Sequence, residues 1–321
     1  MSYHIISIDS PQCSLSCRDG QLTCRTAGQP DRSVPLEDVA SIIITSFSAQ
    51  IHSHLLLEAA RHGVSLIVCE SHKPASLVLP ACRSTDTLLS RAQVSLPEKS
   101  RRRLWELTVD AKCRNQISLA RHLRPDALEI GDMERITAGK NPAKESTVAR
   151  FFWSLYGSAI APPASARERS FVRDRKAEGL NSLLNYGYAV LLSTVLQKLF
   201  AVGLDPTFGI AHAARERSTP LAYDLMEPFR PCVDWRVAQW VRQDAGHLAA
   251  GVTPAFRKWV TGFPLERIDH LDYTLDVRSC AEAVIRSFRR AVIQDTPRLY
   301  KPWIPKNSKW AGSSSPSTSP S

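Results

Sequence analysis

Residues 179–203, GLNSLLNYGYAVLLSTVLQKLFAVG, are the feature that most constrains the fold. Apolar side chains occur on nearly every side of this stretch, and a glycine such as Gly203 is a common helix terminator. A helix that is apolar on most sides has to be surrounded by other elements. The sequence therefore predicts a long helix in the middle of a helical domain, and a rigid starting point for the segment that follows.

The segment over residues 203–234 concentrates the side chains that can carry chemistry. It reads GLDPTFGIAHAARERSTPLAYDLMEPFRPCVD, with one histidine, His212, before Asp224 and Glu227. Residues three apart lie on the same face of a helix, so a loop histidine can close a small pocket over both carboxylates. An acidic pocket beside arginines suits a divalent cation next to a phosphate. The flanking arginines are Arg215, Arg217 and Arg230.

The length of 321 residues favours two domains. Short β-rich runs fill the first part, where Asp19-Gly20 is a hairpin turn signal, and helical spacing dominates after it. We therefore expect an α+β protein. Its parts are a β-rich domain over residues 1–83, a linker over 84–100, a larger all-α domain over 101–300, and a disordered Pro/Ser-rich tail over 301–321.

Charge is distributed unevenly along the chain. Residues 1–95 hold 7 Lys and Arg against 8 Asp and Glu, a net of −1, so the remaining residues carry +11 and the whole chain +10. A basic second part favours a polyanionic partner such as nucleic acid, although a basic protein can also simply be soluble. The same two interpretations apply to the basic helix predicted over residues 102–123, whose cations face a phosphate backbone or only solvent.

The eight cysteines form no CxxC pair, which argues against a structural zinc site. The first residues, MSYHIISID, lack the basic and apolar regions of a secretory signal, and no apolar run is long enough to span a membrane. We expect a cytoplasmic protein with reduced cysteines and no membrane partner.

A second candidate segment is NPAKESTVARFFWSLYG, residues 141–157. Asn141-Pro142 is a helix-start signal, which places Glu145 in an early turn. Taken alone, Glu145 is an acid favoured by the helix dipole and needs no further role.

Three segments together resemble the CRISPR-associated integrase family, whose members insert new spacers into CRISPR arrays. They are residues 141–157, the GLNSLLNYGYAVL run, and residues 203–234. The last segment is most similar to the type II branch, in which GI-x-H and DLMEPFRP-x-VD occur at this spacing. The resemblance covers residues 1–300, and only the Ser/Pro tail lies outside it.

The resemblance implies a metal centre. It places the ligands, and the catalytic role, on Glu145, His212 and Glu227. Asp224 is then a supporting residue that acts through a water or holds a basic group, with helix capping as the alternative. Two carboxylates and an imidazole suit Mg²⁺ or Mn²⁺. Related type II sequences often have two adjacent histidines where this chain has Ala211-His212, so an accessory group is absent here.

The implied reaction joins the 3′-hydroxyl ends of protospacer DNA to the CRISPR repeat by transesterification. Such an exchange needs no ATP, and the chain has no GxxxxGK[ST] loop. The three arginines are candidates for contact with DNA or for orienting the carboxylates, with surface ion pairs as the plainer interpretation. Insertion at two ends implies a homodimer bridged by a small second CRISPR adaptation protein, and we expect the β-rich domain to form the dimer contact.

Two other functions fit the same residues. A structure-selective DNA endonuclease would use the metal site with water as the nucleophile. A non-catalytic DNA-binding scaffold would use the acids only for packing. Metal dependence separates the scaffold from the two enzymes, and the form of the DNA product separates the enzymes from each other.

Overall fold

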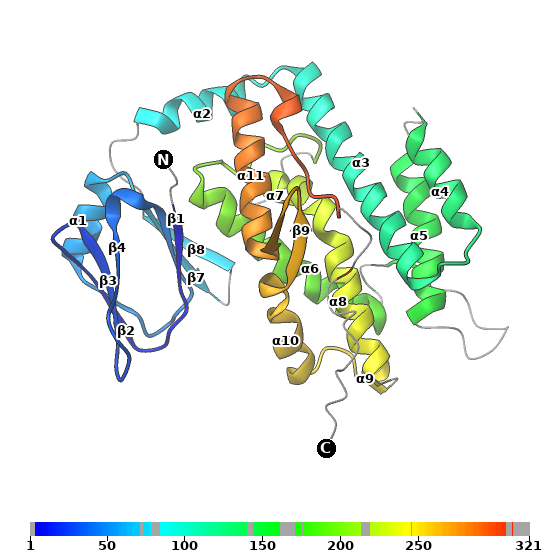
Figure 1. Ribbon diagram of the computed structural model, residues 1–321, viewed down its shortest axis with the longest axis horizontal. Coiled ribbons are helices and arrows are strands. Elements are labelled where there is room, and N and C mark those ends of the chain that lie inside the picture. Colours follow the sequence, from blue (N-terminus) through cyan, green and yellow to red (C-terminus); the bar gives the residue numbers. More distant parts are fainter. Residues whose placement is uncertain are drawn as a thin grey trace.

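The protein has a β-rich N-terminal part followed by a larger helical part, which confirms the α+β fold class (Figure 1). The computed structural model describes residues 4–70, 73–78, 84–139, 144–160, 171–174, 176, 178–212, 219–244, 246–305 and 310.

Two four-stranded sheets build the N-terminal part, with the strand orders β1-β5-β7-β8 and β4-β3-β2-β6. Their elements are β1 His4–Ile8, β2 Cys13–Arg18, β3 Gln21–Thr26, β4 Arg32–Pro35, the 3₁₀ turn η1 Leu36–Asp38, β5 Val39–Ile44, β6 Gln50–Ile51, helix α1 Ser53–Arg61, β7 Ser65–Glu70 and β8 Lys73–Val78. The hairpin expected at Asp19-Gly20 joins β2 to β3, and both turn residues have positive φ, 49° and 73°. That conformation is the one a two-residue hairpin turn requires.

The helical part contains most of the remaining elements. They are α2 Ser84–Val94, α3 Glu98–Leu123, α4 Glu129–Ala138, α5 Lys144–Ile160, α6 Leu180–Ala201, α7 Pro220–Met226, the 3₁₀ turn η2 Glu227–Phe229, α8 Arg230–Gln243, α9 Gly246–Ala250, α10 Pro254–Thr261, η3 Phe263–Leu265, the hairpin β9 Arg267–His270 and β10 Tyr273–Asp276, α11 Val277–Ile293 and η4 Pro297–Leu299.

Strand alternation explains how the two parts join. Side chains of successive strand residues point to opposite faces of a sheet. In β5, Ile42 and Ile44 enter the core between the two sheets together with Leu55 of α1. Ile43 faces the other way and packs with Ala201 at the end of α6. The sheet that contains β5 is therefore apolar on both faces, and the second face rests on the helical part.

Helix α6 is the buried centre that its composition predicts. Leu183, Leu191 and Leu199 are completely buried, and α6 contacts α7, α8, α10 and α11. Gly203, with φ of 79°, ends it. No helix among the described residues has the length and apolar content needed to cross a membrane.

The segment expected as a linker, residues 84–100, contains α2 and the beginning of α3. Helix α2 packs against α11, and Leu89 is fully buried, so apolar contact orders a stretch whose composition is polar. The helical part also contains the β9–β10 hairpin, which a purely helical description omits.

The prediction of disorder for residues 301–321 is wrong for 301–305 and Trp310. The side chains of Trp303 and Trp310 are only 1% and 4% exposed. Indole rings bury a large apolar area, and Trp303 Nε1 also donates a hydrogen bond to the Asp269 carbonyl at 2.8 Å. The Ser/Pro-rich residues after Trp310 lie outside the described part of the chain.

Candidate functional site

The turn η2 is the local feature that orients the acidic residues. Helix α7 leads into η2, and α8 follows at once. Pro228 and Pro231 have no amide hydrogen, so a continuous α-helical hydrogen-bond ladder cannot run through this sequence, and the backbone tightens into a 3₁₀ turn. Asp224 and Glu227 both point inward and are 0% and 4% exposed.

A lysine lies between the two glutamates that the resemblance proposes as ligands. Lys112 Nζ, from α3, is 2.6 Å from Glu145 Oε1 and 2.6 Å from Glu227 Oε2. Glu145 is in the first turn of α5, as predicted from Asn141-Pro142. Three separate elements thus bring two carboxylates to within ion-pair distance of a single cation.

The charges around Glu227 hold it ionised. Burial alone would raise the pKa of Glu227, but Arg230 and Lys112 outweigh that effect and lower the pKa below its ordinary value. Burial would likewise lower the pKa of Lys112, yet Glu227 and Glu145 raise it. Arg230 Nε donates to Glu227 Oε1 at 2.8 Å. Its guanidinium lies 4.6 Å from the centre of the Tyr188 ring.

Asp224 organises the loop that carries His212. Its Oδ2 accepts from the backbone N–H groups of Ile210 at 2.7 Å and Ala211 at 3.2 Å, and its Oδ1 accepts from His212 N at 3.1 Å. A Cβ at Gly209 would lie 2.7 Å from the His212 carbonyl oxygen and 3.1 Å from Asp224 Oδ2. Only glycine permits this close wrapping of the loop, which gives the GI-x-H motif a physical reason.

The imidazole of His212 is held by the same carboxylate. His212 Nδ1 and Asp224 Oδ1 are 2.6 Å apart. This hydrogen bond raises the pKa of His212 against the opposing effect of burial, and the charges of Asp224 and Glu227 raise it further. A carboxylate on one ring nitrogen fixes the tautomer and presents the other nitrogen, Nε2, to a metal ion.

The structure brings the predicted residues together to different degrees. Glu145 and Glu227 meet at Lys112, and His212 lies close enough for the charge of Glu227 to affect its pKa. Asp224 holds a basic residue, His212, which is one of the roles expected for it, and Arg230 orients a carboxylate. Arg215 and Arg217 lie outside the described residues, so their contacts with DNA stay predictions, as does that of Arg230.

The donor set fits a small divalent cation, although in the described part of the chain no three His, Cys, Asp or Glu side chains converge on one point. An ammonium group already lies between the two glutamates. Glu227 Oε2 is buried and has no regular hydrogen bond to the residues described. Lys112 Nζ is the positive charge that this oxygen faces, at 2.6 Å, and a carboxylate oxygen has a second lone pair with which it can bind a cation. Carboxylate oxygens and one imidazole are suitable ligands for such an ion.

Sequence reasoning missed Lys112, Tyr188 and Asp234. Tyr188 Oη donates to Asp234 Oδ1, and Tyr156 Oη donates to the Asp234 backbone carbonyl at 2.8 Å. Burial raises the pKa of Asp234 to about 7, although Tyr188 opposes the shift. The sequence did contain one signal for Lys112. Lys112 is spaced four residues from Thr108 and three from Asn115, which puts all three on one face of α3.

Fold and site together define an α+β protein in which the helical part pairs Glu145 and Glu227 with one lysine, next to a histidine held by Asp224. The family model described as CRISPR associated protein Cas1 matches residues 6–247. A protein named CRISPR-associated endonuclease Cas1 from Neisseria meningitidis serogroup C (strain 8013) is 30% identical over 250 residues, which cover 76% of this chain and 77% of that protein. The chain belongs to the Cas1 family.

Solved structures share the fold. One named "Casposase bound to integration product" gives a TM-score of 0.73 at 18% identity and covers 94% of this chain and 99% of that chain. Another, named "Partial Cas6-RT-Cas1--Cas2 complex", gives 0.71 at 14% identity and covers 94% and 99%. At these identities the likeness shows the architecture alone.

Proposed function

We propose that this protein is a metal-dependent DNA integrase of CRISPR adaptation, of the type II branch, which joins 3′-hydroxyl ends of protospacer DNA to the CRISPR repeat. One observation carries the proposal. Glu145 and Glu227, 82 positions apart in the sequence, meet around a single cationic group, with His212 fixed next to them. The GI-x-H and DLMEPFRP-x-VD motifs, Gly209–His212 and Asp224–Asp234, support the branch assignment.

Glu145, His212 and Glu227 are the residues that would hold Mg²⁺ or Mn²⁺. When bound, such an ion lowers the pKa of an attacking hydroxyl and stabilises the charge that develops on the phosphate. The reaction exchanges one phosphodiester for another, so it needs no ATP and runs in both directions.

The surrounding residues prepare this site. Arg230 fixes the orientation of Glu227, and Asp224 fixes the tautomer of His212, so both groups are placed before DNA arrives. Lys112 lies between the two glutamates that would hold the ion, so its ammonium would be the nearest cationic side chain for contact with a phosphate oxygen at the occupied site. Water is kept from Glu227 by its burial, which strengthens each electrostatic contact there.

We propose double-stranded DNA, a second copy of this chain and a Cas2-type protein as partners. The charge of +10 supports salt-dependent contact with the DNA backbone. One of the solved structures that share this fold is named as a complex with Cas2. The two-sheet N-terminal part is our proposed dimer contact.

A structure-selective endonuclease is the second candidate, because the N. meningitidis relative is named an endonuclease. The same residues serve both reactions, and only the nucleophile differs. Water as nucleophile leaves a cut strand, and a DNA 3′-hydroxyl leaves a joined one.

The test uses a branched DNA that mimics a half-integrated spacer. Release and rejoining of strands are followed with Mn²⁺, Mg²⁺ or EDTA for the wild type and for Glu145→Ala, His212→Ala and Glu227→Ala. Rejoining that needs the metal and is lost in all three variants supports the integrase.

Glu282→Ala is the matched control, because Glu282 is a largely buried carboxylate that pairs with Lys198 away from the site. This variant is expected to keep the rejoining activity. Cutting without rejoining supports the endonuclease. DNA binding without cutting or rejoining in any metal supports the non-catalytic scaffold and refutes both the integrase and the endonuclease hypotheses.

A further inference from the structure

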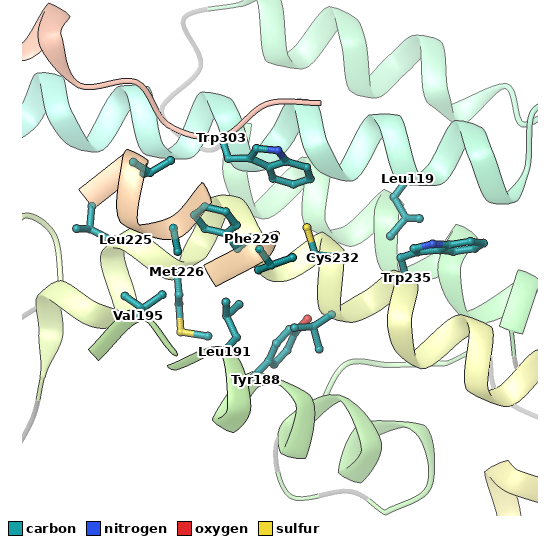
Figure 2. Close-up of a cluster of buried hydrophobic side chains, with 14 of the residues drawn as sticks. Leu119, Tyr188, Leu191, Val195, Leu225, Met226, Phe229, Cys232, Trp235 and Trp303 are labelled. Carbon is teal, nitrogen blue, oxygen red and sulfur yellow. The ribbon is translucent and has the colours of Figure 1, made fainter. Parts of the chain in front are cut away.

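The C-terminal segment 300–303 passes directly over the turn that carries Glu227. In Figure 2, Trp303 lies beside Phe229, the last residue of η2. The two rings are stacked, with centroids 5.7 Å apart and planes 11° from parallel. Both side chains are 1% exposed, so this stack is sealed from solvent.

Asn115 of α3 links the same segment to the same turn. Its Nδ2 donates to the Pro228 carbonyl at 2.7 Å and to the Trp303 carbonyl at 2.9 Å. Pro228 directly follows Glu227 in the sequence, and Asn115 is three residues after Lys112 on α3. Because the buried Asn115 amide donates to both carbonyls, it fixes the distance between segment 300–303 and η2.

The segment is anchored independently of η2. Lys301 N donates to Ser287 Oγ of α11 at 2.9 Å. A hydrogen bond of 3.3 Å joins Thr108 Oγ1 of α3 to Tyr300 Oη. The third anchor is the bond from the Trp303 indole to Asp269 of β9. Because α3, α11 and β9 all hold the segment, it can act as a rigid support for η2.

We propose that Trp303 and Asn115 are positioning residues for Glu227, and that segment 300–303 is a strap that sets the geometry of the cation site. The inference rests on the proposed function of Glu227. Pro228 within η2 and Pro231 at the start of α8 have no amide hydrogen to donate, so local hydrogen bonds alone leave this turn adaptable. Ligands that are misplaced by a fraction of an ångström lose much of their effect.

The experiment compares Asn115→Ala, Trp303→Ala and Trp303→Phe in the full chain. Mn²⁺ binding is measured by calorimetry, and hydrogen exchange is measured at the amides of Phe229 and Arg230 without metal. We expect Asn115→Ala and Trp303→Ala to bind Mn²⁺ about tenfold more weakly, the lower end for residues that support metal ligands. Exchange at the two amides should accelerate. Trp303→Phe keeps an aromatic ring on Phe229 and should restore Mn²⁺ affinity to within about threefold.

Phe256→Leu is the matched control, because Phe256 is completely buried in α10 and packs on Trp240 and Tyr186 instead of η2. It should lose stability while Mn²⁺ affinity and exchange in η2 stay at the wild-type values. If Trp303→Ala does not fold, Asn115→Ala and Trp303→Phe decide the outcome.

Equal Mn²⁺ affinity and equal exchange in Asn115→Ala and Phe256→Leu would overturn the strap. In that case wild type that still binds Mn²⁺ and rejoins DNA would leave the proposed function intact. Wild type that binds no Mn²⁺ would refute the metal centre and the strap together.

Discussion

Replacing Lys112 by methionine tests whether its ammonium occupies the place of a cation between Glu145 and Glu227. Methionine keeps an unbranched side chain of similar length, so little cavity forms. Removing one partner of a buried ion pair costs about 3–5 kcal/mol, because the other charge stays buried. Arg230 remains on Glu227, and the Glu145 side chain is 32% exposed to water. Both facts reduce the loss, so we expect about 2–3 kcal/mol in EDTA.

The assay is thermal unfolding in EDTA and in Mn²⁺. With an unfolding entropy of about 2.1 cal/mol/K per residue, a chain of 321 residues shifts its Tm by roughly 1.5 °C for each kcal/mol, so Lys112→Met should unfold roughly 3–5 °C lower in EDTA. Mn²⁺ can supply the missing positive charge, and a ligand at a hundred times its Kd stabilises by about 2.7 kcal/mol. In wild type the cation has to displace the ammonium first. The Mn²⁺-induced rise in Tm should therefore be larger in Lys112→Met than in wild type.

Lys198→Met is the control for this prediction. Lys198 Nζ lies 3.1 Å from Glu282 Oε2, and its side chain is 6% exposed, so it is another buried pair, but between α6 and α11. This variant should lose stability equally in EDTA and Mn²⁺. If Lys112→Met and wild type gain the same Tm on adding Mn²⁺, the ammonium does not compete with a cation and the reasoning is refuted.

Three further predictions follow from single residues. The pKa of Asp234 is raised to about 7, so the unfolded chain releases this proton at lower pH than the folded chain, and stability falls as pH rises from about 4 to 7. In urea unfolding, Asp234→Asn should reduce the loss of stability between pH 5 and pH 8 by about 3 kcal/mol. A pH profile equal to that of wild type would contradict this. Gly209→Ala should lower rejoining more than tenfold because its Cβ meets the His212 carbonyl, whereas Gly131→Ala, with open space around it, should leave the rate unchanged. Asp224→Asn should lower the pKa of His212 in an NMR titration without metal, and a pKa equal to that of wild type would show that the hydrogen bond does not hold the ring.

The sequence predicted well where one local rule dominates. Asp19-Gly20 made a hairpin because both residues tolerate positive φ, and Gly203 ended α6 for the same reason. Glu145 fell in the first turn of α5 because a helix-start signal precedes it. Its pairing with Glu227, in contrast, came only from the family resemblance, since no local pattern relates residues so far apart.

The C-terminal tail was mispredicted because composition averages over a window. The Ser/Pro-rich residues after 310 dominate the composition of that window, while Trp303 and Trp310 each bury a large apolar side chain in the core of the helical part. Composition likewise gave no indication that the predicted linker over residues 84–100 contains helix α2 and the start of α3. Leu89 and Gln93 are the buried side chains among the described residues of α2, and one apolar residue with one polar residue gives only a weak periodic signal.

Helix α3 shows why hydrophobic periodicity failed where the chemistry lies. Its buried residues include Thr108, Asn115 and Gln116 in addition to Leu104 and Leu119. Buried polar groups need partners, and η2 and the C-terminal segment supply partners to Thr108 and Asn115, just as α5 and η2 supply the partners of Lys112. A face that packs only for stability would gain from apolar residues at these positions. The polar face of α3 therefore serves to hold distant segments in one arrangement, and an amphipathic pattern cannot report a face whose partners are themselves polar.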